Sequence, residues 1–284
     1  MKINKIIQAI IYHLQFLKRT GIDSIYLQDG RLENLYKTYK NNNLNWPNNI
    51  ELNLKKENYD NEADLISDFI NNNMSLETKI DRLAYLKNRM INSSVGKKYN
   101  KLKKKIIFGA GNVEADVLFC GEAPESDEFN QEEPFTGSSG QLLRKIIQAM
   151  GLNYNDVYIT NIMNWYSTKS TPGLNKVLVD TKEIKLCLSC FQLQLNIIKP
   201  IVVVILGAKA AKMLFNLSNI KFTMYNMRGQ WTKFKEFSAI VTYHPSYLLK
   251  NNTIHIKRNF WEDMIKVMEY AKIPVSNKQR AFFT

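Results

Sequence analysis

The chain has 284 residues, 45% of them hydrophobic, which is enough for one large domain or two smaller ones with a real core. Its formal net charge of +13 favours an acidic partner, either a nucleic acid or an anionic membrane surface, although an Asn- and Lys-rich genome would raise the charge in the same way. No apolar stretch approaches the roughly 20 residues that span a bilayer, and the chain does not open with a signal-peptide pattern. The three cysteines give no disulfide framework, which is typical of a reducing compartment. We therefore expect a cytoplasmic protein that does not bind a membrane.

The first hundred residues predict a helical extension. Apolar residues recur at helical spacing over residues 2–19 and again over residues 62–90. A small polar stretch and a lysine run at residues 101–105 follow, and we place a domain boundary there. This divides the chain into an extension at residues 1–100, for whose role and protein partner the sequence gives no indication, and a second domain at residues 101–284.

The second domain shows short apolar runs that alternate with helical segments. Strands are predicted at residues 117–120, 156–162, 200–206 and 239–243, and helices at residues 137–150, 182–198, 208–217 and 260–271. The run at residues 200–206 is rich in valine and isoleucine, as in a strand that is buried on both faces. The alternation predicts an α/β fold with three layers, α/β/α, around a central four-stranded parallel sheet.

Two polar loops directly follow predicted strands. The first loop is Gly121-Glu122-Ala123-Pro124, and the second is His244-Pro245-Ser246-Tyr247-Leu248-Leu249. Because open parallel sheets build their binding sites at the carboxyl ends of the strands, we expect these loops to share one site.

Two further side chains near these loops, and His244 of the second loop, suit the recognition of a nucleic-acid base. Phe135, in a loop before a helix, can stack on a base or pack over the sheet edge. The Asn161 amide offers one donor and one acceptor, although asparagine at a strand end also forms turns or caps helices. An N–H of His244 could stabilise negative charge that develops on a ligand oxygen, although a histidine there is often structural.

Together these motifs resemble the signature of the uracil-DNA glycosylase superfamily in its family-4 form, over about residues 105–271. The resemblance implies an enzyme that hydrolyses the N-glycosidic bond of a flipped-out uracil in single- and double-stranded DNA and so initiates base-excision repair. It implies that Phe135 stacks on the uracil, Asn161 reads its edge and His244 stabilises the leaving base. Ala123 and Glu125 would also line the uracil pocket.

The resemblance further implies acidic and DNA-contacting groups. Glu122 and Glu128 match acidic positions of the family, where a carboxylate could orient water or stabilise the sugar cation. The apolar tip of the second loop suits a wedge that enters the duplex, and serines near a helix N-terminus suit phosphates. The residues expected to contact DNA are Ser138, Ser139, Ser246, Tyr247, Leu248, Leu249 and Lys250.

The chain also departs from the family pattern. Family-4 enzymes usually hold a 4Fe–4S cluster on four cysteines, but only Cys187 stands at such a position here, and Trp165 occupies another. We therefore expect no cluster, no other cofactor and no metal. Glu125 replaces a glycine of the family, and its side chain would either enter the pocket beside C5 of the base or turn outward.

Two alternative functions stay open. The chain could be a catalytically weakened DNA-binding or replisome-associated module on the same fold, since the departures at Glu125 and at the cysteine positions allow a loss of turnover. It could also be a glycosylase of altered base specificity.

Overall fold

The computed structural model describes residues 78–283, apart from residues 126–127, 129–130, 166–180 and 216–222. By its internal contacts the chain divides into residues 1–57 and residues 58–284, and all described residues belong to the second unit. The helix predicted at residues 2–19 and the first part of that at residues 62–90 lie outside the described residues.

A six-stranded sheet in the order β1-β3-β2-β4-β6-β5 forms the centre of the described unit. The strands are β1 (Ala110–Gly111), β2 (Val117–Gly121), β3 (Tyr158–Asn161), β4 (Val202–Leu206), β5 (Trp231–Phe234) and β6 (Phe237–Thr242). The four inner strands are parallel to one another, and β1 and β5 pair antiparallel at the two edges. The predicted four-stranded parallel sheet is confirmed, and two edge strands extend it.

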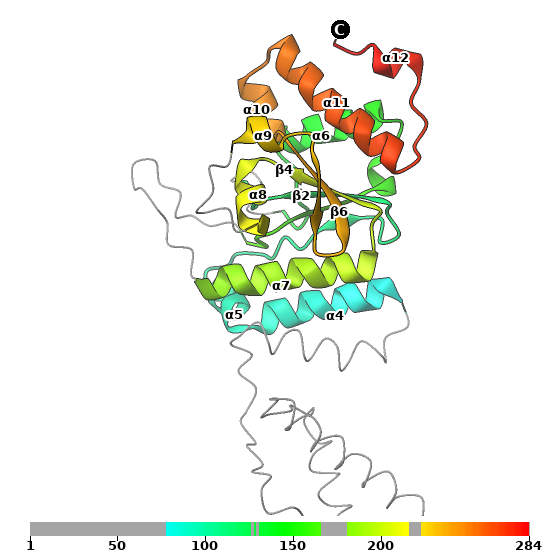
Figure 1. The fold of residues 1–284 in the computed structure, drawn as a ribbon. Coiled ribbons are helices and arrows are strands. Elements are labelled where there is room, and N and C mark those ends of the chain that lie inside the picture. The colour runs from blue at the N-terminus through cyan, green and yellow to red at the C-terminus, as the bar shows by residue number, and fades with distance from the viewer. Residues whose placement is uncertain (1–77, 126–127, 129–130, 166–180, 216–222, 284) are drawn as a thin grey trace, which may run out of the picture. The chain divides into compact units, whose positions relative to one another are not determined.

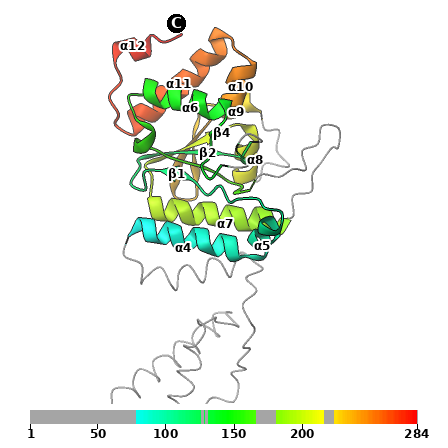
Figure 2. The same cartoon turned by 180° about the vertical axis from the view of Figure 1, so that it is seen from behind.

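Helices cover both faces of the sheet (Figure 1). The helices are α4 (Lys79–Asn92), α5 (Ser94–Lys101), α6 (Ser138–Ala149), α7 (Thr181–Ile198), α8 (Ala208–Phe215), α9 (Met224–Met227), α10 (Pro245–Lys250), α11 (Ile254–Tyr270) and α12 (Asn277–Arg280), with a 3₁₀ turn η2 (Tyr154–Asp156). One face packs against α7 and α8, with α4 beyond α7, and the other packs against α6 and α11 (Figure 2).

Side chains of each inner strand alternate between two buried clusters, as the pleat requires. On β2, Leu118 and Cys120 belong to the cluster under α7, whereas Val117 and Phe119 belong to the cluster under α6 and α11. The three-layer α/β/α fold is therefore confirmed. No helix of the described ranges is both long enough and apolar enough to cross a bilayer.

Helices α4 and α5 pack as part of the same unit as the sheet. Leu86 and Met90 of α4 and Tyr99 of α5 are buried in one cluster with Leu186 and Cys187 of α7. The side chain of Thr78 accepts a hydrogen bond from the backbone N–H of Asp81, which caps α4 at its start. The boundary predicted at residue 100 therefore falls inside a packed unit, because the apolar faces of both helices need α7 as their partner.

Candidate active site

The carboxyl ends of the inner strands bring the predicted loops together. Gly121 at the end of β2 and Asn161 at the end of β3 are paired in the sheet register. β6 ends at Thr242, two residues before His244. The loop after β2 returns to the same edge, because Phe135 lies against Gly121.

Phe135, Gly121 and Asn161 meet in a close contact. A Cβ atom on Gly121 would collide with Oδ1 of Asn161 and would lie 2.8 Å from Cζ of Phe135, so this strand end requires glycine. The ring of Phe135 lies 5.7 Å from the ring of His244, centroid to centroid, with the planes 31° apart. The rings of Phe135 and His244 and the amide of Asn161 therefore border one small region.

The Asn161 side chain is only 1% exposed, yet neither Oδ1 nor Nδ2 has a hydrogen-bond partner among the described residues. A buried amide without partners costs free energy, so its persistence indicates a ligand that supplies both a donor and an acceptor.

His244 is held as a neutral imidazole. Its Nδ1 accepts a hydrogen bond from the backbone N–H of Ser246 at 3.2 Å and lies 2.8 Å from the Ser246 hydroxyl, as part of the cap of α10. Burial, with a smaller contribution from Lys209, lowers the pKa of His244 to about 4. Because Nδ1 accepts, the ring proton is on Nε2, which is then a donor for a bound ligand.

A buried ion pair supports the strand that leads to His244. The Thr242 hydroxyl donates to Oδ2 of Asp263 at 2.7 Å, and the Arg228 guanidinium donates to Oδ1 of Asp263 at 2.6 Å. Sequence reasoning assigned no role to Arg228 or Asp263. Both residues stand among other polar or charged residues and are 35 positions apart, so no local sequence signal links them.

The two predicted acidic residues lie in different surroundings. Glu122 is partly exposed, and its Oε2 lies 3.3 Å from Nζ of Lys209. Glu128 is 2% exposed and accepts the backbone N–H of Glu125 at 3.1 Å. Ala123 is partly buried and packs against the cluster under α7.

Glu125 turns toward the start of α6. The Ser139 hydroxyl donates to Oε2 of Glu125 at 2.9 Å, and Ser139 itself is buried. Ser139 is therefore already engaged by a carboxylate, whereas the neighbouring Ser138 is exposed. The structure joins Glu125 to α6 rather than to Asn161 or Phe135.

The loop predicted as a DNA wedge divides into two faces. Tyr247, Leu249 and Lys250 are exposed, but Leu248 is 5% exposed and packs in the cluster under α6 and α11. The expectation that Leu248 is part of an exposed wedge was wrong, because α10 turns this side chain inward. Ser246 is half-buried and bonded to His244.

The surroundings of Cys187 do not suit an iron–sulfur cluster. Trp165 stacks on Tyr99 with ring centroids 5.2 Å apart and planes 4° apart, and the Tyr99 hydroxyl donates to Oε1 of Glu183 at 2.6 Å. Burial raises the pKa of Cys187 to about 12, as for a thiol enclosed in a packed core. Within the described ranges, no three His, Cys, Asp or Glu side chains are grouped to hold a metal ion.

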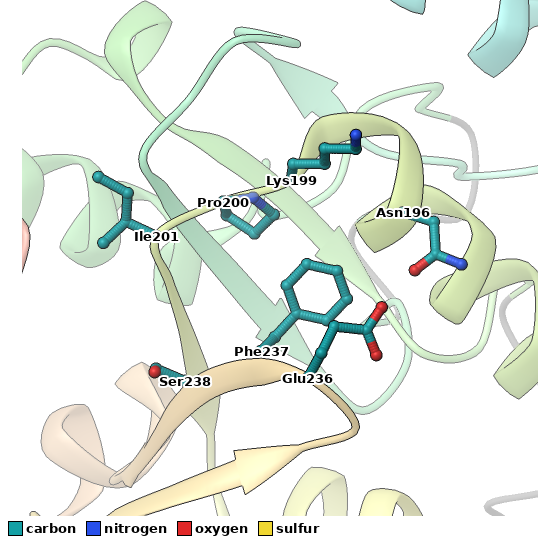
Figure 3. A pocket seen from close by; sticks show the side chains of 7 residues that line it. All are labelled: Asn196, Lys199, Pro200, Ile201, Glu236, Phe237 and Ser238. Carbon is teal, nitrogen blue, oxygen red and sulfur yellow. The ribbon is translucent and has the colours of Figure 1, made fainter.

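A hollow of about 380 Å³ opens at the amino ends of the parallel strands, opposite the carboxyl ends where the predicted loops lie (Figure 3). Its lining comes from the end of α7 and from the amino ends of β4 and β6, in particular Pro200, Ile201 and Phe237. None of the predicted site residues lines it.

Comparison with known proteins gives consistent relatives. The model of the Uracil DNA glycosylase superfamily matches residues 108–265, more than half of the chain. A Type-4 uracil-DNA glycosylase of Archaeoglobus fulgidus is 36% identical over 157 residues, which cover 53% of this chain and 75% of the relative. A Type-4 uracil-DNA glycosylase of Thermotoga maritima is 33% identical over 174 residues, covering 60% of this chain and 85% of the relative. A Type-4 uracil-DNA glycosylase of Sulfurisphaera tokodaii is 31% identical over 202 residues, which cover 69% of this chain and 87% of the relative.

Proposed function

Because this chain belongs to the uracil DNA glycosylase superfamily, we propose that it hydrolyses the bond between uracil and deoxyribose in DNA, the step that initiates base-excision repair. The observation that carries the proposal is the buried, unpartnered amide of Asn161 beside Phe135 and His244.

The uracil edge complements the free groups of this site. A uracil that leaves the helix stacks on the ring of Phe135. Nδ2–H of Asn161 then donates to uracil O4, and Oδ1 of Asn161 accepts the N3–H of uracil. Both orphaned atoms of the buried amide gain partners, which stabilises the flipped base.

Cleavage needs a group that receives the charge of the leaving base. As the C1′–N1 bond breaks, its electron pair stays with the uracil and delocalises onto O2. The Nε2–H of neutral His244 donates a hydrogen bond to O2, which stabilises this anion more than the intact substrate. The sugar cation adds water at C1′, and the proton of that water passes to solvent.

We assign the stabilisation of the positive charge on the sugar to Glu122. Its carboxylate follows β2 at the same sheet edge and is held by Lys209 at 3.3 Å. A carboxylate at this place can stabilise a cationic sugar or orient the attacking water.

DNA is engaged by the exposed groups around the site. We propose that the exposed side chains of Lys250 and Ser138 contact phosphates, and that those of Tyr247 and Leu249 insert at the position that the flipped base leaves. We propose that single- and double-stranded DNA are both substrates, that the protein acts in the cytoplasm, and that it needs neither a metal nor an iron–sulfur cluster.

A single-uracil oligonucleotide tests the proposal. The full chain is incubated with this strand alone and in duplex, abasic sites are cleaved with alkali, and a matched thymine strand is the control. We expect cleavage at uracil in both forms and none at thymine. Tight binding to uracil DNA without abasic sites would instead indicate the DNA-binding module, and cleavage at another base would indicate altered specificity.

A further inference from the structure

The loop between β2 and α6 is organised around one buried carboxyl group. Glu128 is 2% exposed, and its Oε2 accepts the backbone N–H of Glu125 at 3.1 Å. The backbone N–H groups of Phe135 and Thr136 also act on this carboxyl group, since they lower its pKa and so favour its charged form. One side chain therefore joins the start of the loop to the residue that borders the pocket.

Phe135 needs such support because its backbone is in an unfavourable conformation. Its φ is +57°, in the left-handed region that non-glycine residues rarely adopt. Gly140 of α6 lies directly under the Phe135 carbonyl, since a Cβ atom at Gly140 would collide with that oxygen. Gly140 thus leaves room for the Phe135 carbonyl, while the negative charge of Glu128 attracts the Phe135 N–H.

The same contacts argue against a role for Glu128 as the base that activates water. A general base must reach the reacting water with a free oxygen. The Glu128 carboxyl group is buried and engaged by backbone donors from two parts of its own loop.

We infer that Glu128 is a positioning residue: by binding the backbone on both sides of the loop, it holds the Phe135 ring where the flipped base stacks. The inference rests on the proposed function for the identity of the base, but the contact between Glu128 and Phe135 does not depend on it.

The protonation state of Glu128 makes its support of the Phe135 backbone depend on pH. Burial is the main cause that raises the pKa of Glu128 to about 7, and the nearby Glu125 carboxylate adds to it, while the three backbone N–H groups oppose it. Among the described residues, Tyr154 of η2 also interacts electrostatically with Glu128, and Arg144 lies over the Tyr154 ring. As pH falls through about 7, the carboxyl group gains a proton and accepts the backbone N–H groups less strongly.

Three variants separate positioning from base catalysis: Glu128→Gln, Glu128→Ala, and the exposed control Glu132→Gln on the same loop. Glutamine keeps a carbonyl acceptor but cannot take a proton from water. For a positioning residue, we expect Glu128→Gln to retain kcat/KM within about tenfold of the wild type, with no acid limb near pH 7. We expect Glu128→Ala to lose about a hundredfold, with a higher KM and weaker inhibition by free uracil. The Glu132→Gln control should match the wild type.

Equal loss of activity in Glu128→Gln and Glu128→Ala would overturn the inference and indicate a general base. Wild-type activity in Glu128→Ala would show that Glu128 has no role in the reaction.

Hydrogen exchange of the Phe135 and Thr136 amides gives a readout that needs no substrate. We expect faster exchange in Glu128→Ala than in Glu128→Gln, and unchanged exchange in both would refute the contact. If the wild type released no uracil, the proposed function would fail while the exchange measurement still decided the inference. If Glu128→Ala did not fold, the comparison of kcat/KM between Glu128→Gln and the control Glu132→Gln would by itself decide whether Glu128 acts by positioning.

Discussion

The backbone N–H of Ser246 donates to Nδ1 of His244 across 3.2 Å, and this contact fixes which ring nitrogen carries the proton. The donor Nε2–H is therefore present before any substrate binds. A preset donor needs little rearrangement when charge develops on the leaving base, which is how hydrogen-bond donors contribute to catalysis.

His244 should stay neutral at pH values where an ordinary histidine is protonated. Burial lowers its pKa from 6.5 to about 4, so protonation requires a pH more than two units lower. We expect the ring signals of His244, assigned by comparison with His244→Gln, to stay constant in NMR spectra from about pH 8 to about pH 5.5. A titration midpoint near 6.5 would show that the ring is solvated, and the assigned tautomer would lose its basis.

Asn161 should be needed for activity but not for stability. Its amide atoms have no partners within the described part of the chain, so truncation removes an unsatisfied buried group and leaves only a small cavity. We expect Asn161→Ala to reduce excision by about a hundredfold or more while changing the free energy of unfolding by about 1 kcal/mol or less. Urea unfolding and single-turnover kinetics measure the two quantities, and the exposed Asn155→Ala is the matched control. A strongly destabilised Asn161→Ala would indicate a structural amide instead.

The sequence predicted the central fold because its signals there are local. The inner strands β2, β3, β4 and β6 are short apolar runs, and each is followed by a helix or by a recognisable motif. The edge strand β1 has only two residues, and β5 carries an exposed lysine, so neither shows an apolar run.

The parts of the site that sequence could not predict depend on contacts between distant residues. Trp165 was noted as a departure from the family, but its stacking partner Tyr99 lies on the far side of the predicted boundary. The bond between Ser139 and Glu125 depends on how the loop folds back onto α6. Leu248 shows the limit of reading a loop by hydrophobicity alone, because a single helical turn decides which apolar side chain faces the solvent.

Leu248 and Leu249 should therefore respond differently to the same substitution. Leu248→Ala removes a core side chain and should lower the free energy of unfolding by about 2–5 kcal/mol. Leu249→Ala removes an exposed side chain and should leave stability unchanged while weakening excision from duplex DNA more than from single strands. Equal effects of Leu249→Ala on both substrates would argue against a wedge at this position.

The contact of Tyr99 with Trp165 and Glu183 should stabilise the fold without iron. Trp165→Ala should cost about 3–5 kcal/mol of stability through the lost packing, and Tyr99→Phe about 1–3 kcal/mol, because it leaves the buried Glu183 carboxyl with one fewer donor. Urea unfolding measures both changes. Protein purified without oxygen should be colourless, and stoichiometric iron with broad visible absorption would show that a cluster is held in spite of these residues.

Single-turnover release of uracil by the full chain tests the central claim most directly. Free uracil from a single-uracil duplex is quantified for the wild type and for Phe135→Ala, Asn161→Ala and His244→Ala, with Asn155→Ala as control and unfolding curves for each protein. We predict uracil release by the wild type and the control, and a loss of about a hundredfold or more in Asn161→Ala and His244→Ala, with a clear loss in Phe135→Ala. No uracil release by the folded wild type, or wild-type rates in both Asn161→Ala and His244→Ala, would contradict the account.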